Sequence, residues 1–119
     1  MKKILKEEEV NRFKKDGAIF LKGKFDINWI KKLQTGIEKD IKNPSPRFKS
    51  HTIKKNVPAY LEDYWTWDLV SEFKDFVFNS PYAQIASELM SAKKINLVMD
   101  NWFLREGGSK STTPFHHDV

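Results

Sequence analysis

The run from Ile95 to Leu104 constrains the fold more than any other stretch, because it is the longest strand-like segment of the chain. Side chains alternate between the two faces of a strand, so Met99, Asn101 and Phe103 share one face and the residues between them share the other. Neither face is cleanly polar, which predicts an interior strand covered on both sides. Asp100 and Asn101 then need hydrogen-bond partners.

Length and composition limit the chain to one domain. Its 119 residues, with 39% hydrophobic residues, nine Phe and four Trp, suffice for a single domain over residues 1–119 with one core. The absence of cysteine excludes disulfides and thiolate metal sites. No apolar run has the length needed to cross a bilayer, and the N-terminus turns acidic before a signal-peptide core forms. We therefore expect a cytoplasmic protein without membrane contact.

The charge is distributed unevenly along the chain. Residues 1–55 carry 16 Lys and Arg against 7 Asp and Glu, whereas residues 56–119 carry 5 against 9. A basic half can bind nucleic acid or another anion. The lysines are nevertheless spread along helical faces instead of clustering with aromatic residues, so we expect a solvated basic surface and no nucleic-acid partner.

Four helices are predicted before the long strand, each from an apolar stripe with helical spacing. Gly17 stops the first, Asp26 or Asn28 caps the second, and Ser80 followed by Pro81 opens the fourth. Gly36 weakens the second by about 1 kcal/mol relative to Ala. The expected ranges are Glu7 to Asp16, Asp26 to about Lys42, Leu69 to Val77, and Ser80 to Lys93–Lys94.

Two further segments complete the expected architecture. The short apolar run Ala18 to Leu21 predicts a strand buried on both faces. The segment from Arg47 to Trp67 shows no period and is expected to be a long loop, with most of its aromatic residues packed into the core and a role as a lid. His51 lies in this loop without a partner at ligand spacing, so we expect a surface histidine. The overall expectation is an α+β fold.

The C-terminal residues carry the candidate chemistry. In an extended segment His116 and Asp118 point the same way, and His117 points the other way. An imidazole and a carboxylate are two thirds of the 2-His-1-carboxylate set that binds non-haem Fe(II). A His-x-Asp pair also fits a solvated turn, and a structural zinc site would need four protein ligands in a chain without cysteine. No nucleophile elbow accompanies the nearby serines, so a hydrolytic triad is excluded.

The order of these elements resembles the phytanoyl-CoA dioxygenase family, which includes ectoine hydroxylase. The resemblance rests on three stretches that together span nearly the whole chain. The first is the helix, Asp-Gly turn and apolar run of residues 8–23, and the second runs from Ser80-Pro81-Tyr82 to Asn96-Leu97-Val98. The third and most specific runs from Arg105 to Asp118: a basic residue, a Gly-containing loop and a Pro-aromatic-His-x-Asp sequence. The stretch from Arg47 to Trp67 matches least.

The resemblance implies a double-stranded β-helix (jelly-roll) oxygenase with helices packed on one side. It implies Fe(II) and 2-oxoglutarate as cofactor and cosubstrate, with His116 and Asp118 as iron ligands. It also places Met99, Asn101 and Phe103 on the strand face that lines the cosubstrate pocket, with Asn101 as the hydrogen-bonding residue. The implied reaction is hydroxylation of a small or lipid-derived substrate.

The family pattern is incomplete in this sequence. The distal histidine ligand, and the arginine that binds the far carboxylate of 2-oxoglutarate, have no counterpart after Val119. We therefore expect the chain to correspond to the N-terminal portion of such an enzyme and to be inactive alone. The alternative is a noncatalytic module of helices and a partial sheet that binds a partner or an anion through its basic half.

Overall fold

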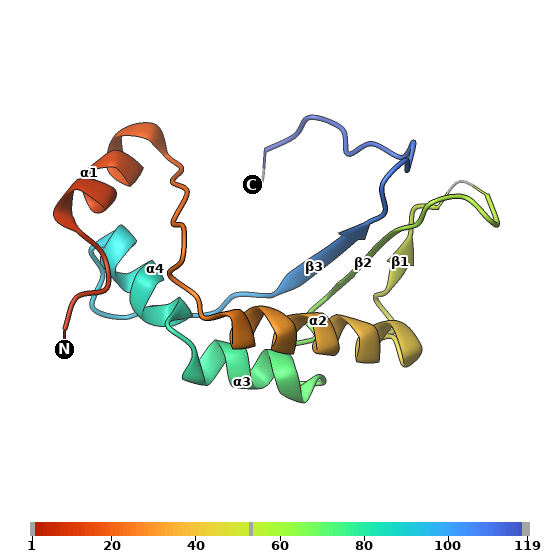
Figure 1. Ribbon diagram of the computed structural model, residues 1–119, viewed down its shortest axis with the longest axis horizontal. Helices are drawn as coiled ribbons and strands as arrows, with labels where there is room; N and C mark the ends of the chain where they lie inside the picture. The colour runs from red at the N-terminus through yellow and green to blue at the C-terminus, as the bar shows by residue number, and fades with distance from the viewer. Residues whose placement is uncertain (1, 53, 118–119) are drawn as a thin grey trace.

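Within residues 2–52 and 54–117, which the computed structural model describes, the chain forms four helices and a three-stranded antiparallel sheet. This arrangement confirms the α+β class. The elements follow in the order α1 (Glu7–Asp16), α2 (Ile27–Lys42), β1 (Lys49–Ser50), β2 (Tyr60–Tyr64), α3 (Ser71–Asn79), α4 (Tyr82–Met90) and β3 (Asn101–Arg105). Figure 1 shows α2 and α3 side by side below the sheet, with α1 and α4 together at the far end.

Helix α1 has the predicted bounds, and Gly17 ends it at φ 72°, in the left-handed region that favours glycine. No Ser, Thr or Asp precedes the helix as a cap, and a side chain of the helix itself bonds to the backbone at its N-terminus instead. The Glu9 carboxylate accepts a hydrogen bond of 2.7 Å from the Lys6 N–H. That bond is the main reason why the pKa of Glu9 is lowered. The Glu9 carboxylate thereby makes the N3 half of a capping box, and the acidic first turn complements the helix dipole.

Helix α2 also begins as predicted, because the Asp26 side chain accepts a 2.7 Å bond from the Asn28 N–H. Gly36, which the sequence marks as a weak point, is buried where α2 crosses α3. A Cβ atom at Gly36 would lie 2.5 Å from a ring carbon of Phe73. The glycine therefore permits a close approach of the two helices.

The strand predicted at Ala18 to Leu21 is absent, and this prediction was wrong. These residues form an extended link between α1 and α2, and within the described chain no strand pairs with them. Phe20 is 86% exposed. An apolar run of this length indicates a strand only when a neighbouring strand satisfies its backbone groups.

The long loop predicted from Arg47 to Trp67 was also wrong in part, since it contains β1 and β2. The sequence does not indicate β2, because Asp63, a fully buried carboxylate, interrupts the apolar pattern of the strand. Ser45 donates to Asp63 through its N–H (3.0 Å) and its hydroxyl (2.7 Å). These bonds offset the cost of burying the group. The prediction that most of the loop aromatics pack into the core is confirmed, since Tyr60 is buried and Phe48 and Trp67 pack against the core cluster, while Trp65 is 48% exposed.

Helices α3 and α4 appear with shifted ends. Helix α3 begins at Ser71, two residues after the predicted start, and Leu69 is exposed before it. The Ser80 hydroxyl accepts a 3.2 Å bond from the Tyr82 N–H, but α4 begins at Tyr82 with Pro81 as its N-cap residue, one position later than predicted. Helix α4 ends earlier than the two lysines suggested, because Ser91 takes a left-handed conformation at φ 51°.

The predicted long strand is regular only in its second half, β3. Sheet order β1-β2-β3 makes β3 an edge strand among the described residues, so the prediction of an interior strand was wrong. The predicted alternation does hold: Trp102 is buried and Leu104 is half-buried, while Asn101, Phe103 and Arg105 are exposed. Trp102 joins Val70 and Phe73 at the centre of the core, against α2 and α3.

No helix in the described part of the chain combines the length and the apolar character needed to span a membrane.

Candidate functional site

The face of the sheet turned away from α2, here called the outer face, carries the residues predicted to line a cosubstrate pocket. Tyr60 of β2 pairs with Arg105 of β3, and Glu62 pairs with Phe103. Paired residues in an antiparallel sheet point to the same side, so these side chains lie together. Strand alternation adds Asn101 to the same face. A mixed surface of aromatic, amide and charged groups results.

A C-terminal arm, residues 109–117, returns over this face. Gly108 turns the chain at φ 87°, and two hydroxyl bonds then hold the arm. Ser111 donates to the His51 carbonyl at 2.6 Å, and the Thr113 and Tyr60 hydroxyls are 2.7 Å apart. Figure 1 shows the arm arching above β3, on the side opposite to α2.

Between the arm and the outer face lies a hollow of about 900 Å³. Its walls contain His116 together with Met99, Asn101 and Phe103, so the structure brings four of the five predicted site residues to one place. Asp118, the fifth, lies outside the described residues. His116 Nδ1 is 2.8 Å from the Pro114 carbonyl oxygen. The full lining is His51, Tyr60, Glu62, Met99, Asn101, Phe103, Arg105, Thr112, Thr113, Pro114 and His116.

The described residues do not form a metal site by themselves. Within residues 2–52 and 54–117 no group of three His, Asp or Glu side chains is placed to hold a metal ion. His116 is one potential ligand that lines the hollow.

The other residues that line the hollow, among them His51, Glu62 and Arg105, were not predicted from the sequence. His51, an exposed histidine as predicted, contacts Glu62, with Nε2 and Oε1 3.0 Å apart. Arg105 lies over the ring of Tyr60, at 5.8 Å from its centroid. His51 and Glu62 are 11 residues apart, and only the pairing of β1 with β2 brings them together. No sequence pattern signals that contact.

Two carboxylates, the half-buried Asp100 and the buried Asp40, fix the position of β3 and hence of its outward residues. Asp100 accepts bonds from the Thr66 N–H and hydroxyl, both 2.9 Å. Trp102 donates its indole N–H to Asp40 at 2.8 Å. The pKa of Asp40 is raised from 3.8 to about 6, chiefly by burial and further by the Asp63 and Asp100 carboxylates, while the bond from Trp102 opposes the rise.

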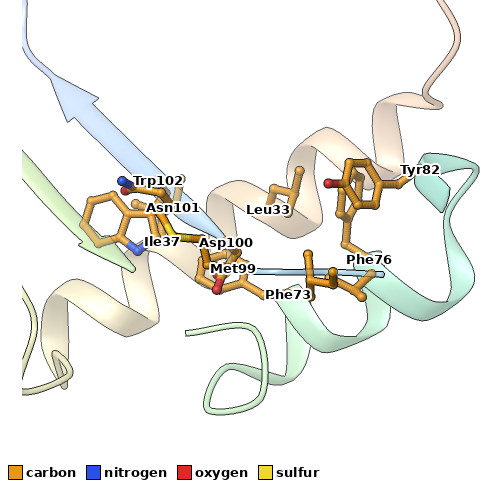
Figure 2. Close-up of a pocket in the computed structure, with 11 residues that line it drawn as sticks. Leu33, Ile37, Phe73, Phe76, Tyr82, Met99, Asp100, Asn101 and Trp102 are labelled. Carbon is orange, nitrogen blue, oxygen red and sulfur yellow. The ribbon is translucent and has the colours of Figure 1, made fainter. Parts of the chain in front are cut away.

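A second, apolar pocket of about 330 Å³ lies on the helix side of the same strand. Figure 2 shows Leu33, Phe73, Phe76 and Tyr82 from the helices turned toward the segment that carries Met99. Its lining is mostly apolar, and its one carboxylate, Asp100, is already bonded to Thr66. This pocket is part of the packing between the helices and the sheet.

No protein-family model, no characterised protein and no solved structure matches this chain.

Proposed function

We propose that the chain is part of an Fe(II)- and 2-oxoglutarate-dependent dioxygenase that hydroxylates a small or lipid-derived molecule. In this proposal β1, β2 and β3 belong to a jelly-roll whose remaining strands come from elsewhere, and the protein is cytoplasmic. The observation that supports it is the lining of one hollow by His116 and by Met99, Asn101 and Phe103. The family resemblance assigns His116 to iron binding and the other three residues to cosubstrate binding. The structure brings them to one hollow even though a turn separates the arm from β3.

The donor chemistry fits part of an iron site. The imidazole of His116 and the carboxylate of Asp118 suit Fe(II). The third ligand and the arginine for the far carboxylate of 2-oxoglutarate have no counterpart among these 119 residues. The proposal therefore requires both from further protein, either a continuation of the chain or a second subunit. Bound iron and 2-oxoglutarate would together supply the oxidising power for hydroxylation.

In this proposal the residues of this chain bind and orient the cosubstrate. The Asn101 amide donates a hydrogen bond to a carboxylate of the cosubstrate. Met99 and Phe103, which are 46% and 57% exposed and line the hollow, would form apolar walls that limit the access of water once a ligand is bound. Asp100 and Trp102 hold these residues in place from the opposite face of the strand.

The first test compares two neighbouring histidines in the 119-residue chain. Fe(II) is titrated anaerobically with and without 2-oxoglutarate, and binding is followed by calorimetry and visible absorption. We expect weak binding that 2-oxoglutarate strengthens, and a loss of about tenfold or more in iron affinity in His116→Ala. His117→Ala, the matched control, should bind iron like the wild type. Equal affinities in the two variants would refute the role of His116.

A second test concerns the third iron ligand and the arginine that would bind 2-oxoglutarate. The coding sequence after codon 119 should encode a histidine followed by an arginine within a strand-like pattern, or a separate chain that supplies them should activate this one. A continuation without either residue, and no activating chain, would exclude the catalytic function.

The alternative, a noncatalytic module that binds an anion, is favoured by one specific observation. Basic and aromatic side chains do gather at the end of the sheet, contrary to the expectation that they would remain apart.

A further inference from the structure

Four side chains at the Tyr64 end of β2, two adjacent rings with a cation at each end, are called here the aromatic–cation row: Lys49, Tyr64, Trp65 and Arg47. Lys49 Nζ lies 5.6 Å from the centroid of the Tyr64 ring. The Tyr64 and Trp65 rings are 6.1 Å apart in an edge-to-face arrangement, and Arg47 Cζ lies 5.7 Å from the centroid of the Trp65 ring. Such spacing is typical of cation–π contacts.

The backbone of the row holds an unfavourable conformation. Trp65 has φ 55°, in the left-handed region that a bulky side chain rarely adopts. Three hydrogen bonds keep it there. Its N–H donates to the Asp100 carbonyl at 3.0 Å, and Arg47 donates to the carbonyls of Tyr64 (2.9 Å) and Trp65 (2.8 Å). Strain that is retained by surrounding bonds is concentrated at functional sites.

This conformation exposes the indole. Trp65 remains 48% exposed, whereas the next residue, Thr66, is fully buried and bonded to Asp100. The chain therefore turns outward for one residue only. A large aromatic ring exposed at the surface beside an arginine is a composition typical of binding hot spots.

The charge of the row is not compensated. Among the described residues neither Arg47 nor Lys49 forms an ion pair with a carboxylate. Glu62, which pairs with Lys49 in the sheet, is bonded to His51 instead. The row thus combines an exposed stacking surface with two cations that pair with no carboxylate among the described residues, and a ligand with a planar ring and negative charge complements both.

We propose that the aromatic–cation row binds single-stranded nucleic acid, with a base stacked on Trp65 and phosphates contacted by Lys49 and by the guanidinium of Arg47. Base stacking on aromatic side chains and phosphate contacts from Lys and Arg are the two means by which proteins bind unpaired strands. A duplex keeps its bases stacked on one another and offers no free ring to the indole. An acidic peptide would use the cations and leave the indole unused.

The test measures binding of a fluorescently labelled oligothymidine to the 119-residue chain by anisotropy at several salt concentrations. Trp65→Gly removes the ring, and glycine tolerates the left-handed backbone, so the fold should be kept or stabilised. We expect Trp65→Gly to weaken binding about tenfold or more. Lys49→Ala should reduce the slope of log affinity against log salt by about 0.7.

Lys14→Ala, an exposed change of equal charge on α1, is the matched control and should leave affinity near that of the wild type. Urea unfolding of each variant verifies that the fold is retained. Unchanged affinity in Trp65→Gly would overturn the proposal. Binding of a duplex, of thymidine monophosphate or of a polyglutamate peptide as tightly as the oligothymidine would also overturn it.

Discussion

Replacing Asp40 by Asn should stabilise the protein, and the gain should depend on pH. Asp40 is 3% exposed and has its pKa raised from 3.8 to about 6. The folded protein therefore binds this proton more tightly than the unfolded chain. The stabilisation that the neutral carboxyl provides is fully present below pH 3.8 and is lost as the pH rises through about 6.

The size of the effect follows from the shift. A pKa difference of this size corresponds to about 3 kcal/mol between the two limits. In Asp40→Asn the amide is neutral at every pH, its oxygen can accept the indole N–H of Trp102, and its NH2 group can donate to Asp63. We therefore expect the variant to be more stable than the wild type by up to about 3 kcal/mol at pH 8, with the advantage shrinking toward pH 4.5.

The assay is urea unfolding between pH 4.5 and 8, followed by tryptophan fluorescence. Other carboxylates contribute to the pH dependence of both proteins, so the quantity of interest is the difference between them at each pH. Asp16→Asn, an exposed change on α1, is the control and should give a difference close to zero. A difference between Asp40→Asn and the wild type that is constant with pH would refute the reasoning, as would destabilisation that grows toward pH 8.

Two further predictions concern contacts of the helices. Gly36→Ala should lower the free energy of unfolding by about 1–3 kcal/mol, because the new methyl group would lie 2.5 Å from the Phe73 ring. A urea midpoint above that of the wild type would contradict this prediction, and the exposed change Gln34→Ala is the control. Glu88→Ala should increase hydrogen exchange at the amides of Ile4 and Leu5 about tenfold or more, because Glu88 accepts bonds of 2.8–3.1 Å from both. Protection that persists in NMR exchange measurements, as expected for the control Glu38→Ala, would show that other contacts hold the N-terminus.

The helices could be predicted because their signals are local. The bounds of α1 and the cap of α2 at Asp26 depend on residues within a few positions of one another. Strand β2 was missed because it contains a buried carboxylate, Asp63, whose partner Ser45 lies 18 residues away. A single sequence shows such a residue as polar, and only the tertiary hydrogen bonds make it an interior one.

The candidate site was likewise predictable only where geometry within one strand decides the positions of its residues. Alternation along β3 correctly grouped Asn101 with Phe103, because strand geometry fixes which residues share a face. The position of His51 and Glu62 side by side in the wall of the hollow could not be predicted, since it depends on the register of β1 against β2. The exposure of Trp65 was also beyond prediction, because hydrogen bonds from distant residues hold its left-handed backbone.

The sheet has two unlike edges, and this decides how it can be extended. On one side β1 offers only two residues, Lys49 and Ser50, which is too short a template for another strand. On the other side β3 offers five residues whose outward backbone groups pair with no strand in the described chain. Any strand added by further protein would therefore join beside β3, and a barrel built on this sheet would grow in one direction only.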